Sequence, residues 1–257
     1  MPSVPAGEKI WLSLCRYGRR VSGVDLAGTS TRYGSRSMRL FYDIATITMK
    51  ALLISLTRWR VEGKENVPRT GPLIVVANHH NIIDPPLISA SVPRRISFMA
   101  KEELFRSRML RAIVQNYGAF PVRRGQLDRV AVRWALTALQ NGGALGMFPE
   151  GKRSPNAQLQ SPQPGASLLA ARSGVPILPV GISGSERVNG IGFILHRPRI
   201  NVTIGRPFRL ASSGDKVTRS RLAQHSELIM EHIAELLPES YRGVYDLRGS
   251  LRSDSGD

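Results

Sequence analysis

Leu73–Ala77 is an uninterrupted apolar run that leads directly into the polar residues Asn78 and His79. A strand that is apolar on both faces is typical of the parallel sheet of an α/β protein, because helices cover both sides of such a sheet. Further strand candidates are short apolar runs or period-two alternations; they lie at 96–99, 144–148, 177–182 and 200–204. The alternation in the last of these predicts an edge or half-exposed strand.

Helical patterns lie between the predicted strands. Asp128 can cap a helix that runs to about Gln140, where Gly142 and Gly143 can end it. Other helices are predicted at 85–90, 166–172 and 222–237. This alternation favours the α/β class: a layered sheet of mostly parallel strands flanked by helices, in one domain over 60–240.

The segments outside that domain differ in character. Residues 1–36 are polar, basic and rich in Gly and Ser, which indicates a loosely ordered arm, and 241–257 indicates a flexible tail. The first 15 residues lack the long apolar run of a secretory leader.

Residues 37–59 predict an amphipathic helix that docks on a membrane. Its polar residues recur at helical spacing along one side: Arg39, Asp43, Thr46, Lys50 and Thr57. A charge in the middle of a spanning helix costs about 2.5–3.5 kcal/mol on insertion scales, which disfavours a tilted span. The helix either lies in the membrane interface or covers the protein core.

The formal net charge of +17 attracts anionic partners such as lipid headgroups, phosphorylated ligands or nucleic acid. Aromatic residues make up only 6% of the chain and no nucleic-acid-binding motif is present, so we expect no nucleic acid partner. The single cysteine, Cys15, excludes an internal disulfide, and the histidine spacings match no zinc motif, so neither a metal nor a cofactor is expected.

His79 and Asp84 follow the first predicted strand, where α/β folds usually place their chemistry. On one regular helix they would point about 140° apart, so they meet only if the chain turns back between them. Asp84 before Pro85 suits the N-cap of a helix and makes such a turn plausible. A carboxylate on one imidazole nitrogen leaves the other free to take a proton. The alternative is a capped helix beside two exposed histidines.

Three further elements are candidates for substrate binding. Gly118–Gly125 joins a turn to a short strand and a pair of arginines, Arg123 and Arg124, a side chain suited to phosphate. Phe148–Ser154 follows a strand and contains Glu150, Gly151, Lys152 and Arg153. Either segment can also be a solvated charged turn.

Val175–Val180 contains Pro176 and Pro179, which predict an edge, a bulge or a ligand-lining turn, because proline is disfavoured in a central strand. Simple core packing is the alternative for this segment.

In this order, the four elements resemble the lysophosphatidic acid acyltransferase family of glycerolipid acyltransferases, including its bacterial 1-acyl-sn-glycerol-3-phosphate members. The resemblance covers about 61–207. It depends most on Asn-His-x4-Asp at 78–84 and Phe-Pro-Glu-Gly-x-Arg-Ser at 148–154.

The resemblance implies that His79 is the general base and that Asp84 orients it, with direct acyl transfer and no acyl-enzyme. It also implies substrate-binding roles for Asn78, Gly118, Arg124, Glu150, Gly151, Lys152, Arg153 and Pro179. The sequence differs from the usual family pattern at two positions, Arg123 and Lys152. Gln163 takes the place of a lysine associated with the acceptor phosphate.

The expected function is therefore transfer of a fatty acyl group from acyl-CoA or acyl-carrier protein to the sn-2 hydroxyl of 1-acylglycerol-3-phosphate. Another lysolipid or glycerol-3-phosphate is the alternative acceptor, because Gln163 removes a cation. A nucleic-acid binder and a non-catalytic membrane-surface protein are alternatives of other classes. The expected location is the cytoplasmic face of the cell membrane, as a peripheral or monotopic protein in contact with anionic lipids.

Overall fold

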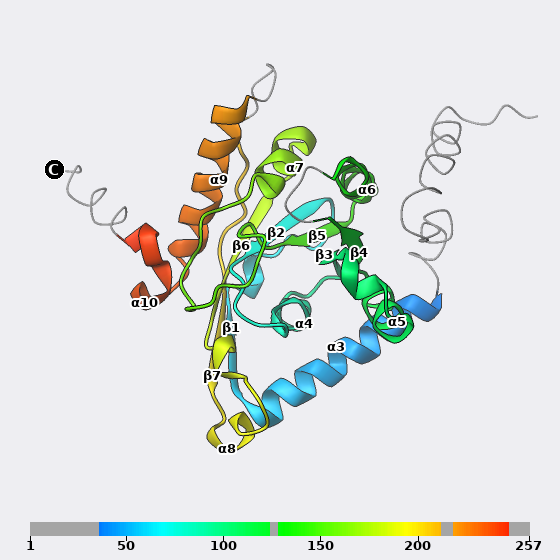
Figure 1. The fold of residues 1–257 in the computed structure, drawn as a ribbon, viewed down its shortest axis with the longest axis vertical. Helices are drawn as coiled ribbons and strands as arrows, with labels where there is room; N and C mark the ends of the chain where they lie inside the picture. The colour runs from blue at the N-terminus through cyan, green and yellow to red at the C-terminus, as the bar shows by residue number, and fades with distance from the viewer. Residues whose placement is uncertain (1–35, 124–127, 212–217, 247–257) are drawn as a thin grey trace, which may run out of the picture.

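The computed structural model describes residues 36–123, 128–211 and 218–246. In these residues seven strands form one sheet in the order β1-β7-β6-β2-β5-β3-β4 (Figure 1). The strands are β1 (Arg58–Glu62), β2 (Leu73–Ala77), β3 (Ile96–Lys101), β4 (Phe120–Val122), β5 (Ala144–Met147), β6 (Ile177–Ser183) and β7 (Arg199–Ile204). β2 to β6 run parallel to one another, β7 is antiparallel to β6, and β1 is parallel to β7. The predicted sheet of mostly parallel strands is confirmed.

Helices cover both faces of the sheet. They are α3 (Arg36–Leu56), α4 (Asp84–Ser91), α5 (Arg108–Asn116), α6 (Arg129–Gln140), α7 (Gly165–Ser173), α8 (Phe193–His196), α9 (Arg219–Ala234) and α10 (Glu239–Arg242). Short 3-10 turns lie at Lys64–Asn66, Glu102–Phe105, Ser185–Arg187 and Gly243–Tyr245. α6, α7 and α9 pack on one face, and α3 and α4 pack on the other (Figure 1).

The central strand β2 explains this layering. Ile74 and Val76 face the α6–α7–α9 layer, whereas Leu73, Val75 and Ala77 face the layer of α3 and α4. All five side chains are at most 1% exposed. The uninterrupted apolar run is therefore required, since both sides of the strand are removed from water.

The expected helix over 37–59 is wrong at its carboxyl end. α3 ends at Leu56, and Arg58–Glu62 forms the edge strand β1 beside β7. Within β1 the arginines and Glu62 are exposed and Trp59 and Val61 are partly buried, a period-two pattern that fits an edge strand.

α3 has an inner and an outer side. On the inner side Tyr42 and Leu53 are buried, and the Tyr42 hydroxyl accepts the main-chain N–H of Ile96 at 3.1 Å. Thr57, predicted to lie on the polar side of the helix, follows the last residue of α3 and is buried. The outer side leaves large apolar side chains exposed: Leu40, Phe41, Ile44, Ile47, Leu52 and Ile54. None of the helices in the described residues is long and apolar enough to span a membrane.

Of the two alternatives predicted for 200–204, the half-exposed strand is confirmed: β7 alternates between exposed and buried residues and is not an edge strand, because β1 lies outside it. One further expectation requires correction. Part of the expected tail is ordered, since Tyr245 is 4% exposed in the core. The proposed arm, apart from Arg36, and 247–257 lie outside the described residues.

Pro179 lies inside the interior strand β6, opposite Val76 of β2, and not at an edge or a ligand-lining turn. Its carbonyl accepts the Gly205 N–H at 2.9 Å, and the regular β6–β7 ladder starts only at the next pair, Val180 and Ile204. A proline is tolerated here because the missing N–H falls where the β7 chain leaves the ladder.

Candidate active site

His79 and Asp84 meet at the carboxyl end of β2. The chain turns between β2 and α4, and His79 Nδ1 lies 2.8 Å from Asp84 Oδ2. The Asp84 side chain is fully buried and that of His79 is 9% exposed. The turn that the five-residue spacing required is therefore present.

Asp84 holds this turn through one oxygen. Its Oδ2 also accepts the main-chain N–H groups of His80 and Asn81, each at 2.7 Å. Asp84 was expected to cap α4, but it is the first residue of that helix, and its side chain bonds to the preceding turn. A carboxylate with three donors on one oxygen fixes the loop and the imidazole together.

The main chain of His79 is held from the other side by the segment at 148–154. Its N–H donates to Glu150 Oε1 at 2.9 Å, and its carbonyl accepts the Ser154 N–H at 2.7 Å. The second Glu150 oxygen accepts the Gln160 N–H at 3.0 Å. Sequence reasoning placed Glu150 among the substrate contacts, but its carboxylate is buried and bonded to the protein's own backbone.

The environment of Glu150 changes its acidity. Burial raises the pKa of this carboxyl to about 7, and the hydrogen bonds from the His79 and Gln160 N–H groups oppose that shift. Charge repulsion from Asp84 adds to the rise in pKa.

The imidazole of His79 stacks on Phe148, with ring centroids 4.0 Å apart and planes 19° apart. Phe148 in turn stacks on Phe98 of β3 at 6.0 Å. Asp84 and Phe148 together set the ring's orientation. No hydrogen bond to Nε2 from the described residues is present, which leaves that nitrogen for a ligand.

Asn78, a predicted substrate contact, is fully buried and used internally. Its side-chain amide exchanges two hydrogen bonds of 2.7 Å with the main chain of Ile182 in β6, and its Nδ2 lies 3.1 Å from His80 Nε2. Burial lowers the pKa of His80, which favours the neutral ring. Asn78 therefore fixes the loop against β6.

Lys152 and Arg153 are exposed on the turn that also supplies Glu150 and Ser154. Gly151 has φ +70°, which favours glycine, and an added Cβ there would lie 3.0 Å from Cγ of Gln163. Gln163 thus lies beside Gly151, the residue that precedes the two cations. The structure brings Gly151, Lys152 and Arg153 next to the His79 loop, as the sequence predicts.

The second predicted element is only partly described. Arg124 lies outside the described residues, and its neighbour Arg123 is exposed and pairs with Glu102 at 2.8 Å. Gly118 has φ +82°, and its nearest atoms belong to the start of β3 at Ile96 and Ser97. The carboxyl ends of the parallel strands carry His79, so Gly118 lies at the opposite edge of the sheet and does not join the site.

Among the described residues no group of three or more His, Cys, Asp or Glu side chains is arranged to hold a metal ion. The chemistry that the arrangement supports is proton transfer by an imidazole whose partner is a buried carboxylate, next to exposed cations.

The family model, the two bacterial relatives and the solved structure described below are all named as acyltransferases. A family model described as "Acyltransferase" matches residues 58–183, which contain His79, Asp84, the 148–154 segment and Pro179.

Two bacterial relatives carry the name 1-acyl-sn-glycerol-3-phosphate acyltransferase. The chain is 25% identical to that of Bacillus subtilis over 76% of this chain and 96% of the relative. It is 28% identical to that of Streptococcus pneumoniae over 70% of this chain and 69% of the relative.

A crystal structure of the 1-acyl-sn-glycerophosphate acyltransferase of Thermotoga maritima superposes with a TM-score of 0.58. The match covers 97% of this chain and 93% of that chain at 23% identity, which supports a common fold.

Proposed function

We propose that the chain transfers a fatty acyl group to the sn-2 hydroxyl of 1-acylglycerol-3-phosphate, giving phosphatidic acid, on the basis of the matching acyltransferase family model and the names of the bacterial relatives. The donor is a thioester, acyl-CoA or acyl-carrier protein. The names of the bacterial relatives support this acceptor. The observation that carries the proposal is the 2.8 Å contact between His79 and the buried Asp84.

The geometry supports general-base catalysis by His79. With its Nδ1–H donated to Asp84, Nε2 carries the lone pair that takes the proton of the acceptor hydroxyl. The hydroxyl oxygen then attacks the thioester carbonyl carbon, the C–S bond breaks, and the departing thiolate recovers the proton from the imidazolium. No acyl-enzyme forms in this scheme. Base catalysis of this kind contributes about 10²–10⁴-fold, and the remainder comes from positioning two bound substrates.

Glu150 and Ser154 act as positioning residues in this proposal. They hold the N–H and the carbonyl of His79, so the loop does not have to order itself when substrate binds. The exposed Lys152 and Arg153 carry no ion pair in the described residues and are suited to the acceptor phosphate. Arg124 is proposed to join them.

The residue at position 163 bears on the choice of acceptor. Gln163 offers an amide, not a cation, beside Gly151. Another lysolipid or glycerol-3-phosphate therefore stays the alternative acceptor.

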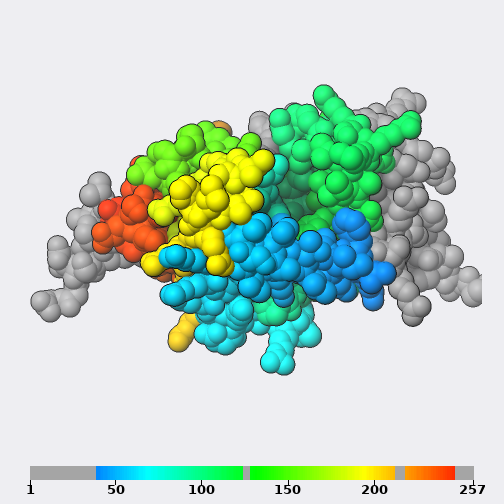
Figure 2. All heavy atoms as spheres, turned by 90° about the horizontal axis from the view of Figure 1, so that it is seen from below, coloured from blue at the N-terminus to red at the C-terminus, as the bar shows by residue number. Residues whose placement is uncertain are grey.

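We further propose that the protein works at the cytoplasmic face of the cell membrane without spanning it. The outer side of α3 exposes Ile44, Ile47 and Ile54 at 55%, 66% and 63%. The amphipathic α5 adds exposed Met109 and Ile113 among arginines. Figure 2 shows α3 in blue between the green segment around α5 and the yellow segment around α8, with a hollow where the three approach. Apolar side chains mixed with cations suit an anionic membrane interface.

The test is an acyl-transfer assay with purified protein. Liposomes, labelled acyl-CoA or acyl-carrier protein, and a panel of lysolipids and glycerol-3-phosphate are incubated together, and products are identified by mass spectrometry. We expect phosphatidic acid from wild type and no product from His79→Ala. His225→Ala on α9 is the matched control, and circular dichroism verifies folding. No product with any acceptor contradicts the proposed function, and retained turnover in His79→Ala removes His79 from the mechanism.

A further inference from the structure

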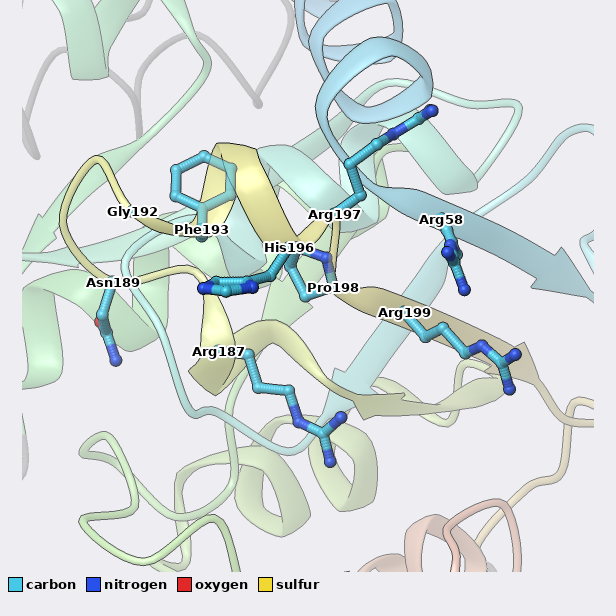
Figure 3. A pocket seen from close by; sticks show the side chains of 9 residues that line it. All are labelled: Arg58, Arg187, Asn189, Gly192, Phe193, His196, Arg197, Pro198 and Arg199. Carbon is cyan, nitrogen blue, oxygen red and sulfur yellow. The ribbon is translucent and has the colours of Figure 1, made fainter.

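A pocket of about 650 Å³ opens where β1, β7 and α8 meet (Figure 3). Arg58, Arg187, Arg197, Arg199 and His196 line it. None of the described residues that line the pocket carries a carboxylate. This concentration of positive charge indicates a ligand with negative charge.

Two of these arginines stand at paired positions. Arg58 of β1 is the register partner of Arg199 of β7, and the N–H of Arg58 donates to the Pro198 carbonyl at 2.9 Å. Neither guanidinium makes an ion pair within the described residues. Like charges directly opposite on neighbouring strands repel each other, and an anion between them would remove that repulsion.

The other two arginines have different surroundings. Arg187 is 66% exposed, and its Nε forms an ion pair with Glu186 Oε1 at 3.4 Å. Arg197 donates to the Ile54 carbonyl at the end of α3. In Figure 3 Arg197 extends toward that helix, whereas Arg58, Arg187 and Arg199 extend the other way. Arg197 thus fixes the segment to α3, Arg58 and Arg199 are free of ion pairs among the described residues, and the exposed Arg187 can reach a ligand by sharing or leaving Glu186.

Large apolar side chains occupy the same segment. Ile191 and Leu195 are 83% and 86% exposed, and Ile194 is 42% exposed. Ile54, also exposed, lies at the carboxyl end of α3, the end to which Arg197 bonds. A small soluble anion would require the arginines but not these side chains. A bilayer with anionic lipids accounts for both.

We propose that the segment 187–199, together with Arg58, is a membrane-contact site that binds the phosphate of an anionic phospholipid headgroup. Ile191 and Leu195 enter the boundary between headgroups and acyl chains, and Arg58, Arg187 and Arg199 reach the lipid phosphates. The site is separate from the acceptor site, because β7 lies two strands from β2, about 10 Å across the sheet.

The segment is also tied to the catalytic loop. Asn81, between His79 and Asp84, donates from Nδ2 to the carbonyls of Ser185 and Val188, each at 3.0 Å. Lipid binding at 187–199 therefore holds the catalytic loop at a fixed height above the bilayer. The inference rests on the proposed function only in assuming that the lipid acceptor lies in a bilayer.

The test is binding to vesicles of phosphatidylcholine with and without phosphatidylglycerol, measured by co-sedimentation. The variants are Arg58→Gln with Arg199→Gln, and Ile191→Ser with Leu195→Ser. Loss of two arginine–lipid contacts is expected to weaken binding to phosphatidylglycerol vesicles about 30-fold. The apolar pair is expected to weaken binding to both kinds of vesicle. Arg129→Gln with Arg133→Gln on α6 removes the same charge elsewhere and should change binding only a few-fold.

Two results would overturn the inference: vesicle binding by the Arg58/Arg199 variant equal to wild type, or an equal loss in the α6 control. If the first is accompanied by weaker binding of free coenzyme A, titrated without lipid, the pocket is assigned to the donor. Wild-type acyl transfer in neutral detergent micelles is measured separately. If transfer fails while vesicle binding follows the prediction, the proposed function is wrong and the headgroup site stands.

Discussion

The main-chain N–H of His79 donates to a carboxylate oxygen of Glu150, 71 residues later in the chain, at 2.9 Å. Glu150 is 1% exposed, and its other oxygen accepts the Gln160 N–H. A buried acid thereby braces the backbone of the proposed catalytic base, while a second buried acid, Asp84, contacts its ring. Glu150 therefore fixes the main chain of His79, and Asp84 fixes its ring.

The raised pKa of Glu150 predicts a pH-dependent stability. The pKa is about 7 in the folded protein against 4.5 for an ordinary glutamate. The folded state therefore binds more protons between these values, and stability falls as pH rises through that window, by up to about 3 kcal/mol. Urea unfolding of wild type and Glu150→Gln from pH 5 to pH 8 measures this. The difference in unfolding free energy should change with pH, and parallel curves would contradict the assignment.

Asp84→Asn is predicted to lower kcat about 10²–10⁴-fold. An amide cannot stabilise the imidazolium as a carboxylate does, and it can hold the wrong tautomer of His79. The measurement is kcat together with ¹⁵N chemical shifts of the His79 ring. A purely structural role for Asp84 would lower the thermal midpoint without changing the tautomer, so an unchanged ring spectrum in an inactive, folded variant would count against the dyad.

Gln163→Lys is predicted to lower KM for a phosphate-bearing acceptor several-fold. The side chain at 163 lies over Gly151, next to Lys152 and Arg153, so a lysine there adds a third cation to the proposed phosphate site. KM for a lysolipid without net negative charge should stay the same. Gln158→Lys, on an exposed residue of the same region, is the control for added charge. Equal effects of both variants would argue against a specific phosphate contact.

Replacing Ile44 and Ile47 by Ser is predicted to reduce partitioning onto phosphatidylglycerol vesicles at least about tenfold. Both side chains are more than half exposed, so the change removes little packing. Val244→Ser, at a residue 65% exposed outside α3, is the control. Vesicle flotation measures binding, and thermal unfolding verifies that the fold persists. Binding equal to wild type would show that α3 only covers the core.

Local sequence was sufficient where one segment determines its own structure. Asp128 accepts the N–H groups of Val130 and Ala131 and starts α6, as its position before an apolar stripe predicts. The run Leu73–Ala77 is a strand because its composition already requires two covered faces.

The sequence was insufficient where distant segments decide the outcome. The charge of Glu150 is visible in the sequence and predicts a ligand contact. Its actual hydrogen-bond partners lie 71 and 10 residues away and are internal, which the local sequence does not show. For Pro179 the sequence leaves core packing as the alternative to an edge, a bulge or a ligand-lining turn, because the departure of the β7 chain at Gly205, which permits a proline there, cannot be read from residue 179. The period-two alternation at 58–62 indicates a strand. The apolar helical pattern before it nevertheless led to a helix prediction that continued through residue 59.

Only Thr57 separates α3 from β1, and its N–H and hydroxyl both donate to the Leu53 carbonyl, at 3.0 and 2.6 Å. Because one hydrogen-bonded residue is the whole connection, α3 has little freedom to reorient relative to β1. If α3 rests on a bilayer, as proposed, the His79 loop stays at the membrane surface and does not turn toward water to collect substrate. Acceptor and product then exchange by lateral diffusion within the leaflet. Turnover would therefore follow the surface mole fraction of the acceptor, and dilution with inert lipid would slow it at constant bulk concentration.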